Sequence, residues 1–229
     1  EMNSFAVIQN NHVQQKIGIG SPLLFPKESF LDPEFTYSVS KHQTACGISD
    51  IISHCLEYWF GHGNSPLIDE FIISIIKEVK DISTPLLNDL TNYELRSRML
   101  ITSTMALNGI TSVGKTSADW GVHDIAHTLS VLYDIPHGEA LAITYPAWLK
   151  TIPNREDERL HSFSKNIFPA SNIENSIKNF ETFLKNIGLD NCISKFVLNE
   201  DDKCQLIETL IANKVNGQNY KITNKNILK

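Results

Sequence analysis

The sequence predicts a mostly α-helical protein that begins with a short stretch of β structure. Strand-like runs are confined to the first 33 residues, whereas from about residue 38 onward apolar side chains recur at the spacing typical of helices. The composition, 41% hydrophobic and 20% charged, is that of a globular protein that can bury a substantial core. We therefore expect a β segment at 1–36 followed by an all-α domain at 37–229.

The β segment contains two strand-like runs and a candidate third. FAVIQN at 5–10 and QKIGIG at 15–20 flank the polar stretch NNHVQ, and this pattern predicts a hairpin. ESFLDP at 28–33 indicates another strand, which Pro33 would close.

The remainder divides into helical segments separated by loops that contain proline, asparagine or glycine. The expected helices cover 41–60, 67–81, 92–108, 120–133, 137–151, 157–167, 172–187, a short turn near Cys192, and 202–214. We find no internal repeat and no low-complexity tract.

Charge and apolar run length exclude several classes of partner. The net charge is −6 without a dense stripe of Lys and Arg, which argues against nucleic acid and against an anionic membrane. No apolar run approaches the roughly 18–20 residues that span a bilayer, and no signal peptide is seen. The four cysteines lack CxxC spacing, and Cys46 and Cys55 are expected to be buried free thiols in a reducing cytoplasm.

Three histidines are concentrated in the stretch 119–142. His123 and His127 are four residues apart, so on a helix they share one face, with Cβ atoms about 5–6 Å apart. His137 follows Pro136, which should end one helix or begin the next. A corner of this kind can aim imidazoles from two helices at one point.

Asp50 and His54 repeat the four-residue spacing on an otherwise apolar helix. An unpaired carboxylate is costly to bury, so the histidines would give Asp50 groups with which to share a site. One carboxylate with up to three neutral imidazoles suits Zn²⁺ or Fe²⁺ better than Mg²⁺ or Ca²⁺. Spacing alone favours His123 with His127 as the chelating pair.

Four segments carry a resemblance that spans nearly the whole chain: EMNSFAVI, LDPEFT, QTACGISDIISHCLEYW and HDIAHTLSVLYDIPHGEALAI. In order and spacing they resemble the iron-containing alcohol dehydrogenases, especially the butanol dehydrogenase-like branch. The resemblance implies an oxidoreductase, an NAD(P)-linked alcohol dehydrogenase or aldehyde reductase acting on small primary alcohols and aldehydes. By analogy it also implies a homodimer.

The resemblance assigns roles to individual residues. It implies that Asp50, His54, His123 and His137 bind the metal ion, Fe²⁺ or Zn²⁺. The position of His127 would lie near the nicotinamide and take part in proton transfer, which replaces the chelating pair favoured by spacing. Lys16 matches a lysine that contacts the NAD(P)H nicotinamide. Asp119 and Trp120 match a DW pair, without an assigned role.

One part of the family pattern is not found. The family binds the cofactor pyrophosphate on a glycine-rich loop of an α/β domain, but no GGGS-type or GxGxxG segment occurs here. The expectation is that residues 1–36 are the end of that domain, that most of it is absent, and that this chain alone is inactive.

Two alternatives remain. His123 and Asp124 form an HD doublet, as in HD-type metal phosphohydrolases, with His54 and Asp134 as outer members. However, Asp124 should point about 100° away from the His123 face. The other alternative is a non-catalytic helical domain in which a closed metal site is structural.

Overall fold

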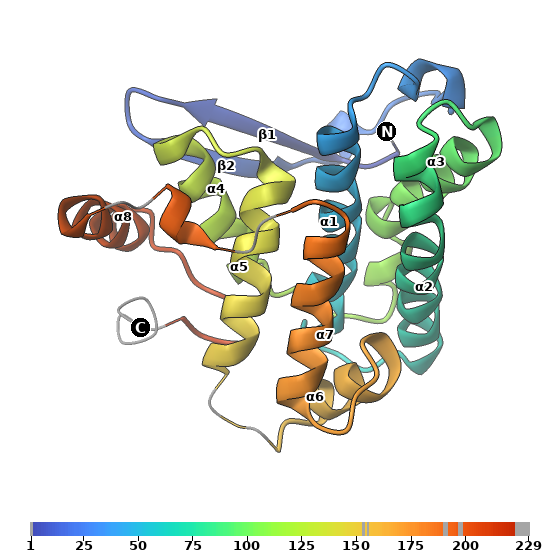
Figure 1. Ribbon diagram of the computed structural model, residues 1–229. Helices are drawn as coiled ribbons and strands as arrows, with labels where there is room; N and C mark the ends of the chain where they lie inside the picture. The colour runs from blue at the N-terminus through green and yellow to red at the C-terminus, as the bar shows by residue number, and fades with distance from the viewer. Residues whose placement is uncertain (1, 153, 155, 190–191, 197–198, 223–229) are drawn as a thin grey trace.

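The computed structural model describes residues 2–152, 154, 156–189, 192–196 and 199–222. A β-hairpin lies across one end of an assembly of helices (Figure 1). The expectation of a mostly helical fold with a short β segment is confirmed.

The hairpin forms where the sequence predicts it. β1 (Phe5–Asn10) and β2 (Gln15–Gly20) pair antiparallel, with Phe5 opposite Gly20 and Asn10 opposite Gln15. β2 packs against α4 (Gly121–Tyr133).

The predicted third strand at 28–33 is wrong. No strand forms there, and Pro33–Thr36 is a 3-10 helix. The Asp32 side chain accepts a hydrogen bond from Glu34 N, and Pro33 occupies the first helical position, where its missing N–H costs nothing. These signals for a helix start outweigh the apolar residues before them.

The helices follow the predicted order. Besides α4 they are α1 (Lys41–Trp59), α2 (Pro66–Asn88), α3 (Tyr93–Leu107), α5 (His137–Thr151), α6 (Glu158–Ser162), α7 (Ile173–Asn186) and α8 (Glu200–Ala212).

Three of these helices differ from the prediction. α2 continues past Asp81 because its buried face extends through Ile82 and Leu86, and Pro85 is accommodated near its last turn. The segment 157–167 divides into α6 and a π-helical turn, Phe163–Ile167. α8 begins before Asp202 because Asn199 and Asp202 form a capping box.

α1 is the central helix of the molecule. It contacts α2, α3 and α5, and its side chains are buried along most of its length (Figure 1). α5 approaches it so closely that a Cβ atom on Gly138 would lie 2.0 Å from the carbonyl oxygen of Cys46. This contact holds the first turn of α5, and therefore His137, against α1.

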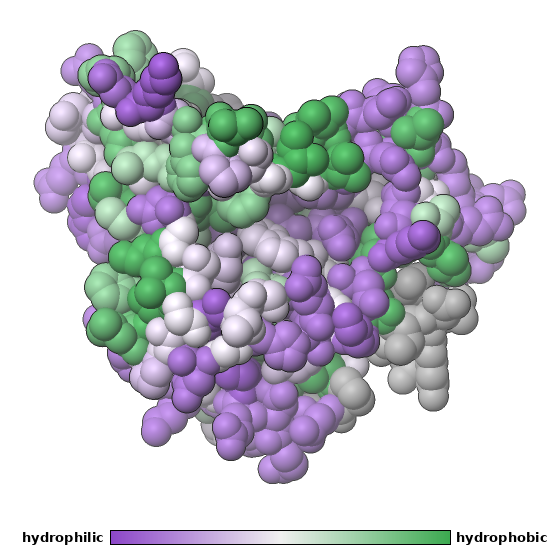
Figure 2. Space-filling model, turned by 180° about the vertical axis from the view of Figure 1, so that it is seen from behind, coloured by the Kyte–Doolittle hydropathy of each residue, from purple (hydrophilic) through white to green (hydrophobic). Residues whose placement is uncertain are grey.

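Part of the apolar surface is not covered. Phe5, Val7, Ile8, Ile17 and Ile19 of the hairpin are between 40% and 54% exposed. Figure 2 shows apolar side chains gathered at the upper edge of the molecule, on both sides of a depression. None of the helices in the described part of the chain is both long and apolar enough to cross a membrane.

Candidate metal centre

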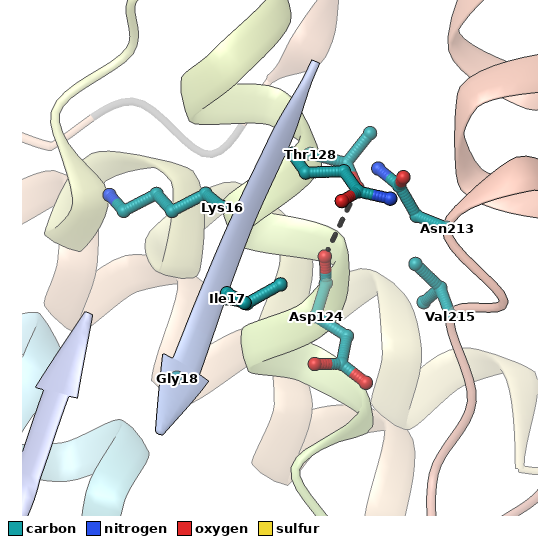
Figure 3. Close-up of a pocket in the computed structure, with 8 residues that line it drawn as sticks. Lys16, Ile17, Gly18, Asp124, Thr128, Asn213 and Val215 are labelled. Atoms are coloured by element: carbon teal, nitrogen blue, oxygen red, sulfur yellow. Dashed lines mark hydrogen bonds between the residues drawn. The ribbon is translucent and has the colours of Figure 1, made fainter. Parts of the chain in front are cut away.

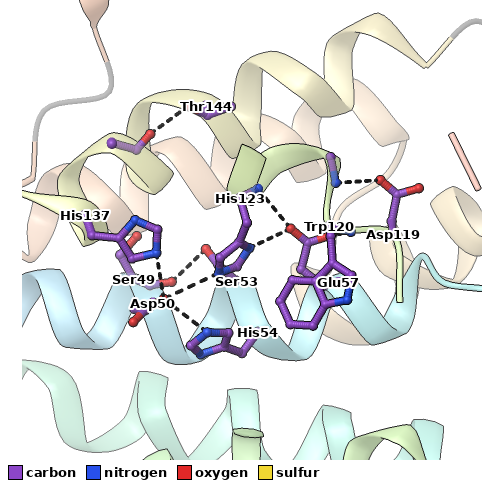
Figure 4. Close-up of polar contacts among 12 residues, drawn as sticks. Ser49, Asp50, Ser53, His54, Glu57, Asp119, Trp120, His123, His137 and Thr144 are labelled. Atoms are coloured by element: carbon purple, nitrogen blue, oxygen red, sulfur yellow. Dashed lines mark hydrogen bonds and ion pairs between the residues drawn. The ribbon is translucent and has the colours of Figure 1, made fainter. Parts of the chain in front are cut away.

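Three helices bring one carboxylate and three imidazoles together. Asp50 and His54 come from α1, His123 from the first turn of α4, and His137 from the first residue of α5. The Nε2 atoms of the histidines lie 3.6, 3.7 and 3.8 Å from Asp50 Oδ1, in the order His54, His123, His137 (Figure 4). The Pro136 corner between α4 and α5 turns His137 toward His123, as the sequence predicts.

The geometry of this group suits a bound cation. Asp50 Oδ1 and His123 Nε2 are buried, and within the described ranges neither has a hydrogen-bond partner. Ligand atoms of Asp50, His123 and His137 all lie within 4.8 Å of one another. Ligands about 2.0–2.2 Å from a tetrahedral ion are themselves about 3.3–3.6 Å apart. The three separations from Asp50 Oδ1, 3.6–3.8 Å, are close to that spacing, and the ligand atoms of Asp50, His123 and His137 lie within 4.8 Å of one another, so the donor set fits a divalent ion with small side-chain adjustments.

The electrostatics of the group agree with this fit. Burial alone would raise the pKa of Asp50, but His54, His137 and His123 outweigh it and lower the pKa. Burial lowers the pKa of His54 and brings the pKa of His137 to about 4, so both are neutral at pH 7, the form in which imidazole binds a metal.

His123 behaves differently. Burial alone would lower its pKa, but Asp50 and Glu57 outweigh burial and raise the pKa to about 9. Two carboxylates therefore favour positive charge at this ring.

His127 lies beside the group without joining it. Its ring centroid is 5.0 Å from that of His137 and 6.4 Å from that of His123. Among the described residues, ligand atoms of Asp50, His123 and His137 all lie within 4.8 Å of one another; His127 is not in this group, and His54 is linked to it through Asp50 Oδ1, 3.6 Å from its Nε2. The chelating pair favoured by spacing alone, His123 with His127, is thus not the pair that the fold assembles.

Lys16 on β2 faces the same region. The pKa of Lys16 is lowered by burial, and the charge of Asp50 only partly offsets this. The positive charge of Lys16 in turn contributes to the lowered pKa values of His127 and His137. Figure 3 shows its ammonium group extending away from Asp124. Lys16 is therefore close enough to influence the histidines electrostatically.

Sequence reasoning missed Glu57. Its side chain is fully buried and accepts hydrogen bonds from the ring and the backbone of His123. The signal was available, because an acidic residue among Leu56, Tyr58 and Trp59 raises the same question of burial cost as Asp50 does.

Two cavities adjoin these residues. One, of about 330 Å³, reaches Asp50 and His54, and its lining combines apolar side chains such as Ile51 and Leu100 with polar ones such as Gln43. This volume is at the low end for ligand pockets, which are about 300–1,000 Å³.

The second cavity, of about 190 Å³, lies between β2, α4 and the segment after α8, and Asp124 and Thr128 line it (Figure 3). Asp124 thus faces away from the ligand group, as its position on the helix predicts, and the HD-type arrangement is not formed.

The sequence and the fold match known proteins. The sequence model of the Fe-containing alcohol dehydrogenase family, C-terminal, matches residues 44–229. A probable NADH-dependent butanol dehydrogenase 1 of Bacillus subtilis is 36% identical over 98% of this chain and 60% of its own length. NADH-dependent butanol dehydrogenase A of Clostridium acetobutylicum is 32% identical over 88% of this chain and 54% of its own length.

The structural comparison covers the same share of the chain as the sequence comparison does. The crystal structure of NADH-dependent butanol dehydrogenase A from Thermotoga maritima superposes with a TM-score of 0.90 at 30% identity, over 98% of this chain and 60% of that one. The chain therefore spans about 60% or less of the length of these relatives.

Proposed function

Because the chain belongs to the Fe-containing alcohol dehydrogenase family, we propose that it supplies the metal-binding part of an NAD(P)-linked alcohol dehydrogenase or aldehyde reductase. Small primary alcohols and aldehydes are the proposed substrates, since the named relatives include butanol dehydrogenases. The observation that carries the proposal is the placement of three imidazole Nε2 atoms 3.6–3.8 Å from Asp50 Oδ1.

Asp50, His54, His123 and His137 would hold the ion, Fe²⁺ or Zn²⁺. When bound, such an ion lowers the pKa of a bound hydroxyl or polarises a bound carbonyl. The side chain of Asp50 is 32% exposed, and the cavity of about 330 Å³ reaches it. An accessible position of this kind favours a catalytic site over a closed structural one.

His127 would accept the hydroxyl proton of the alcohol, or donate it back to the aldehyde. Burial, followed by His137, His123 and Lys16, lowers its pKa to about 3, so its imidazole is neutral and has an acceptor nitrogen. Lys16, on the strand facing this region, would contact the nicotinamide. A homodimer, a cytoplasmic location and the inactivity of this chain alone remain predictions.

The test is elemental analysis of the purified chain beside Asp50→Ala and His127→Ala. We expect about one equivalent of iron or zinc in the unaltered chain and in His127→Ala, and none in Asp50→Ala. Asp81→Ala, an exposed aspartate on α2, is the matched control.

The catalytic half of the proposal needs a second assay. NADH- and NADPH-dependent reduction of butanal is measured on the protein in which the chain occurs, with the same variants. A metal-loaded protein without reductase activity would contradict the proposed reaction, whereas loss of metal from His127→Ala would contradict the division of roles.

A further inference from the structure

Glu57 forms a buried connection between α1 and the start of α4. The Glu57 side chain is 0% exposed and accepts three N–H groups from α4 and its N-cap residue. Trp120 N donates to Oε2 at 2.7 Å, and His123 N donates to Oε1 at 3.2 Å. His123 Nδ1 lies 2.6 Å from the same Oε1 (Figure 4).

This arrangement determines which ring nitrogen of His123 is free when the ring is neutral, the form in which an imidazole binds a metal. An ionised carboxylate can only accept hydrogen bonds, so Nδ1 must carry the proton that is shared with Glu57. In a neutral imidazole the other nitrogen, Nε2, then holds the lone pair. Nε2 is the atom that lies 3.7 Å from Asp50 Oδ1.

We infer that Glu57 is a positioning residue that fixes the tautomer and orientation of His123, so that Nε2 presents its lone pair to a divalent cation beside Asp50. The inference rests on the proposed metal centre. A histidine ligand whose second nitrogen donates to a carboxylate is oriented and made more basic by that hydrogen bond.

The same carboxylate holds the backbone that carries His123. Trp120, the N-cap of α4, has a left-handed backbone with φ +61°, which is a strained conformation for a bulky residue. Its indole has no acceptor atom, so it cannot accept hydrogen bonds from the free N–H groups at the start of the helix. Glu57 accepts two of these N–H groups, and its negative charge is favourable at a helix N-terminus. The Trp120 ring in turn packs edge-on against His54 and His123, with centroids 6.3 and 5.1 Å away.

Two variants and a control test this role. In Glu57→Gln the amide has one oxygen, so its NH₂ group must face either Trp120 N–H, which then loses its acceptor, or His123, whose backbone N–H and Nδ1 both lose theirs. Glu57→Asp keeps the carboxylate on a shorter side chain. Glu78→Gln, at a partly exposed ion pair between α2 and Arg98 of α3, is the matched control.

The first readout is the Zn²⁺ dissociation constant of the chain, measured by competition with a chromophoric chelator. We expect Glu57→Gln to bind Zn²⁺ about 10–100-fold more weakly, Glu57→Asp to recover part of this loss, and Glu78→Gln to match the unaltered chain. Thermal melting of the metal-free proteins separates loss of affinity from loss of fold.

The second readout requires no variant. A ¹H–¹⁵N spectrum of the unaltered Zn²⁺-loaded chain should show a protected proton on Nδ1 of His123. A proton on Nε2 instead, or a Glu57→Gln affinity within twofold of the unaltered chain, would overturn the role of Glu57 alone. Failure of the unaltered chain to bind Zn²⁺ would overturn the metal centre and the role of Glu57 with it. If Glu57→Gln does not fold, Glu57→Asp and the spectrum decide.

Discussion

His127 and His137 lie side by side, with ring centroids 5.0 Å apart, but it is His137 whose Nε2 atom lies 3.8 Å from Asp50 Oδ1. His127 is one helical turn beyond His123, so the axis of α4 carries its ring past the carboxylate. The proposed function accordingly assigns them different roles, metal binding to His137 and proton transfer to His127.

Replacing each of these histidines with alanine should therefore have different effects. His137→Ala should weaken Zn²⁺ binding by more than the roughly 10–100-fold expected for loss of an outer partner of a ligand. His127→Ala should leave the dissociation constant nearly unchanged. A chelator-competition titration of both variants measures this, and equal losses would contradict the separation of roles.

The close contact between α1 and α5 predicts opposite effects at two glycines. Gly138→Ala places a Cβ atom 2.0 Å from the Cys46 carbonyl oxygen, so the helices must separate, at a cost of about 3 kcal/mol or more. Gly47→Ala, an exposed position within α1 with nothing within 4 Å of its added Cβ, should stabilise the fold by up to about 1 kcal/mol.

Urea unfolding of both glycine variants tests this contact. Because Gly138 adjoins His137, Gly138→Ala should also weaken Zn²⁺ binding. A Gly138→Ala protein as stable as the unaltered chain would show that the contact is looser than described.

A sequence without coordinates predicts much of this fold, because the strongest signals are local. The two strands of the hairpin and the whole of α5 match their predicted bounds, since alternation, proline placement and helical periodicity depend on nearby residues. The prediction ends the second helix at residue 81, whereas α2 continues to Asn88, because its buried face extends through Ile82 and Leu86.

For the site, helix spacing and the family resemblance led to different predictions. Spacing alone pairs His123 with His127, since periodicity shows which residues share a helix face but not what that face meets. The resemblance named Asp50, His54, His123 and His137, and the structure places the three histidine Nε2 atoms 3.6–3.8 Å from Asp50 Oδ1. The apolar neighbours of Glu57 indicate that it is buried, but its partner His123 lies 66 residues away, and local sequence does not identify a partner at that distance.

An ion-pair cluster at Asp69 predicts a pH-dependent contribution to stability. Asp69 contacts Lys115 Nζ at 2.7 Å and the Arg159 guanidinium at 2.7 and 3.0 Å. Burial alone would raise the pKa of Asp69, but Arg159 and Lys115 outweigh it and lower the pKa below its ordinary value of 3.8. The ionised carboxylate therefore stabilises the fold above pH 3.8, and this stabilisation is lost as the pH falls below that value.

Asp69→Asn should cost about 3 kcal/mol at pH 7, because the side chain of Lys115, 1% exposed, loses its counter-charge. The difference from the unaltered chain should shrink as the pH is lowered toward 3. Denaturant unfolding across this pH range measures it, with Asp81→Asn as control. A difference that stays constant with pH would contradict the assignment.

Asp119 predicts how the segment 215–222 is held. Its buried carboxylate accepts hydrogen bonds from Gly121 N, Asn219 N and Tyr220 N. Asp119→Ala should release this segment, because two of its N–H groups, those of Asn219 and Tyr220, lose their acceptor at about 1–3 kcal/mol each where they stay buried.

Limited proteolysis should then cleave Asp119→Ala within 215–222 much faster than the unaltered chain, while Asp81→Ala behaves as the unaltered chain does. Unchanged protection in Asp119→Ala would show that packing of Tyr220 against Phe60 and Trp148 is sufficient to hold the segment.

The uncovered hairpin has a practical consequence for work with this polypeptide. Within the described residues each of its strands has a single neighbour, so both outer edges offer free N–H and C=O groups beside half-exposed Phe5, Ile8 and Ile17. Ribbons of this kind pair with one another in concentrated solution. Self-association of the purified protein should therefore increase with concentration. Val7→Lys or Ile17→Lys should reduce this self-association without altering the helical core.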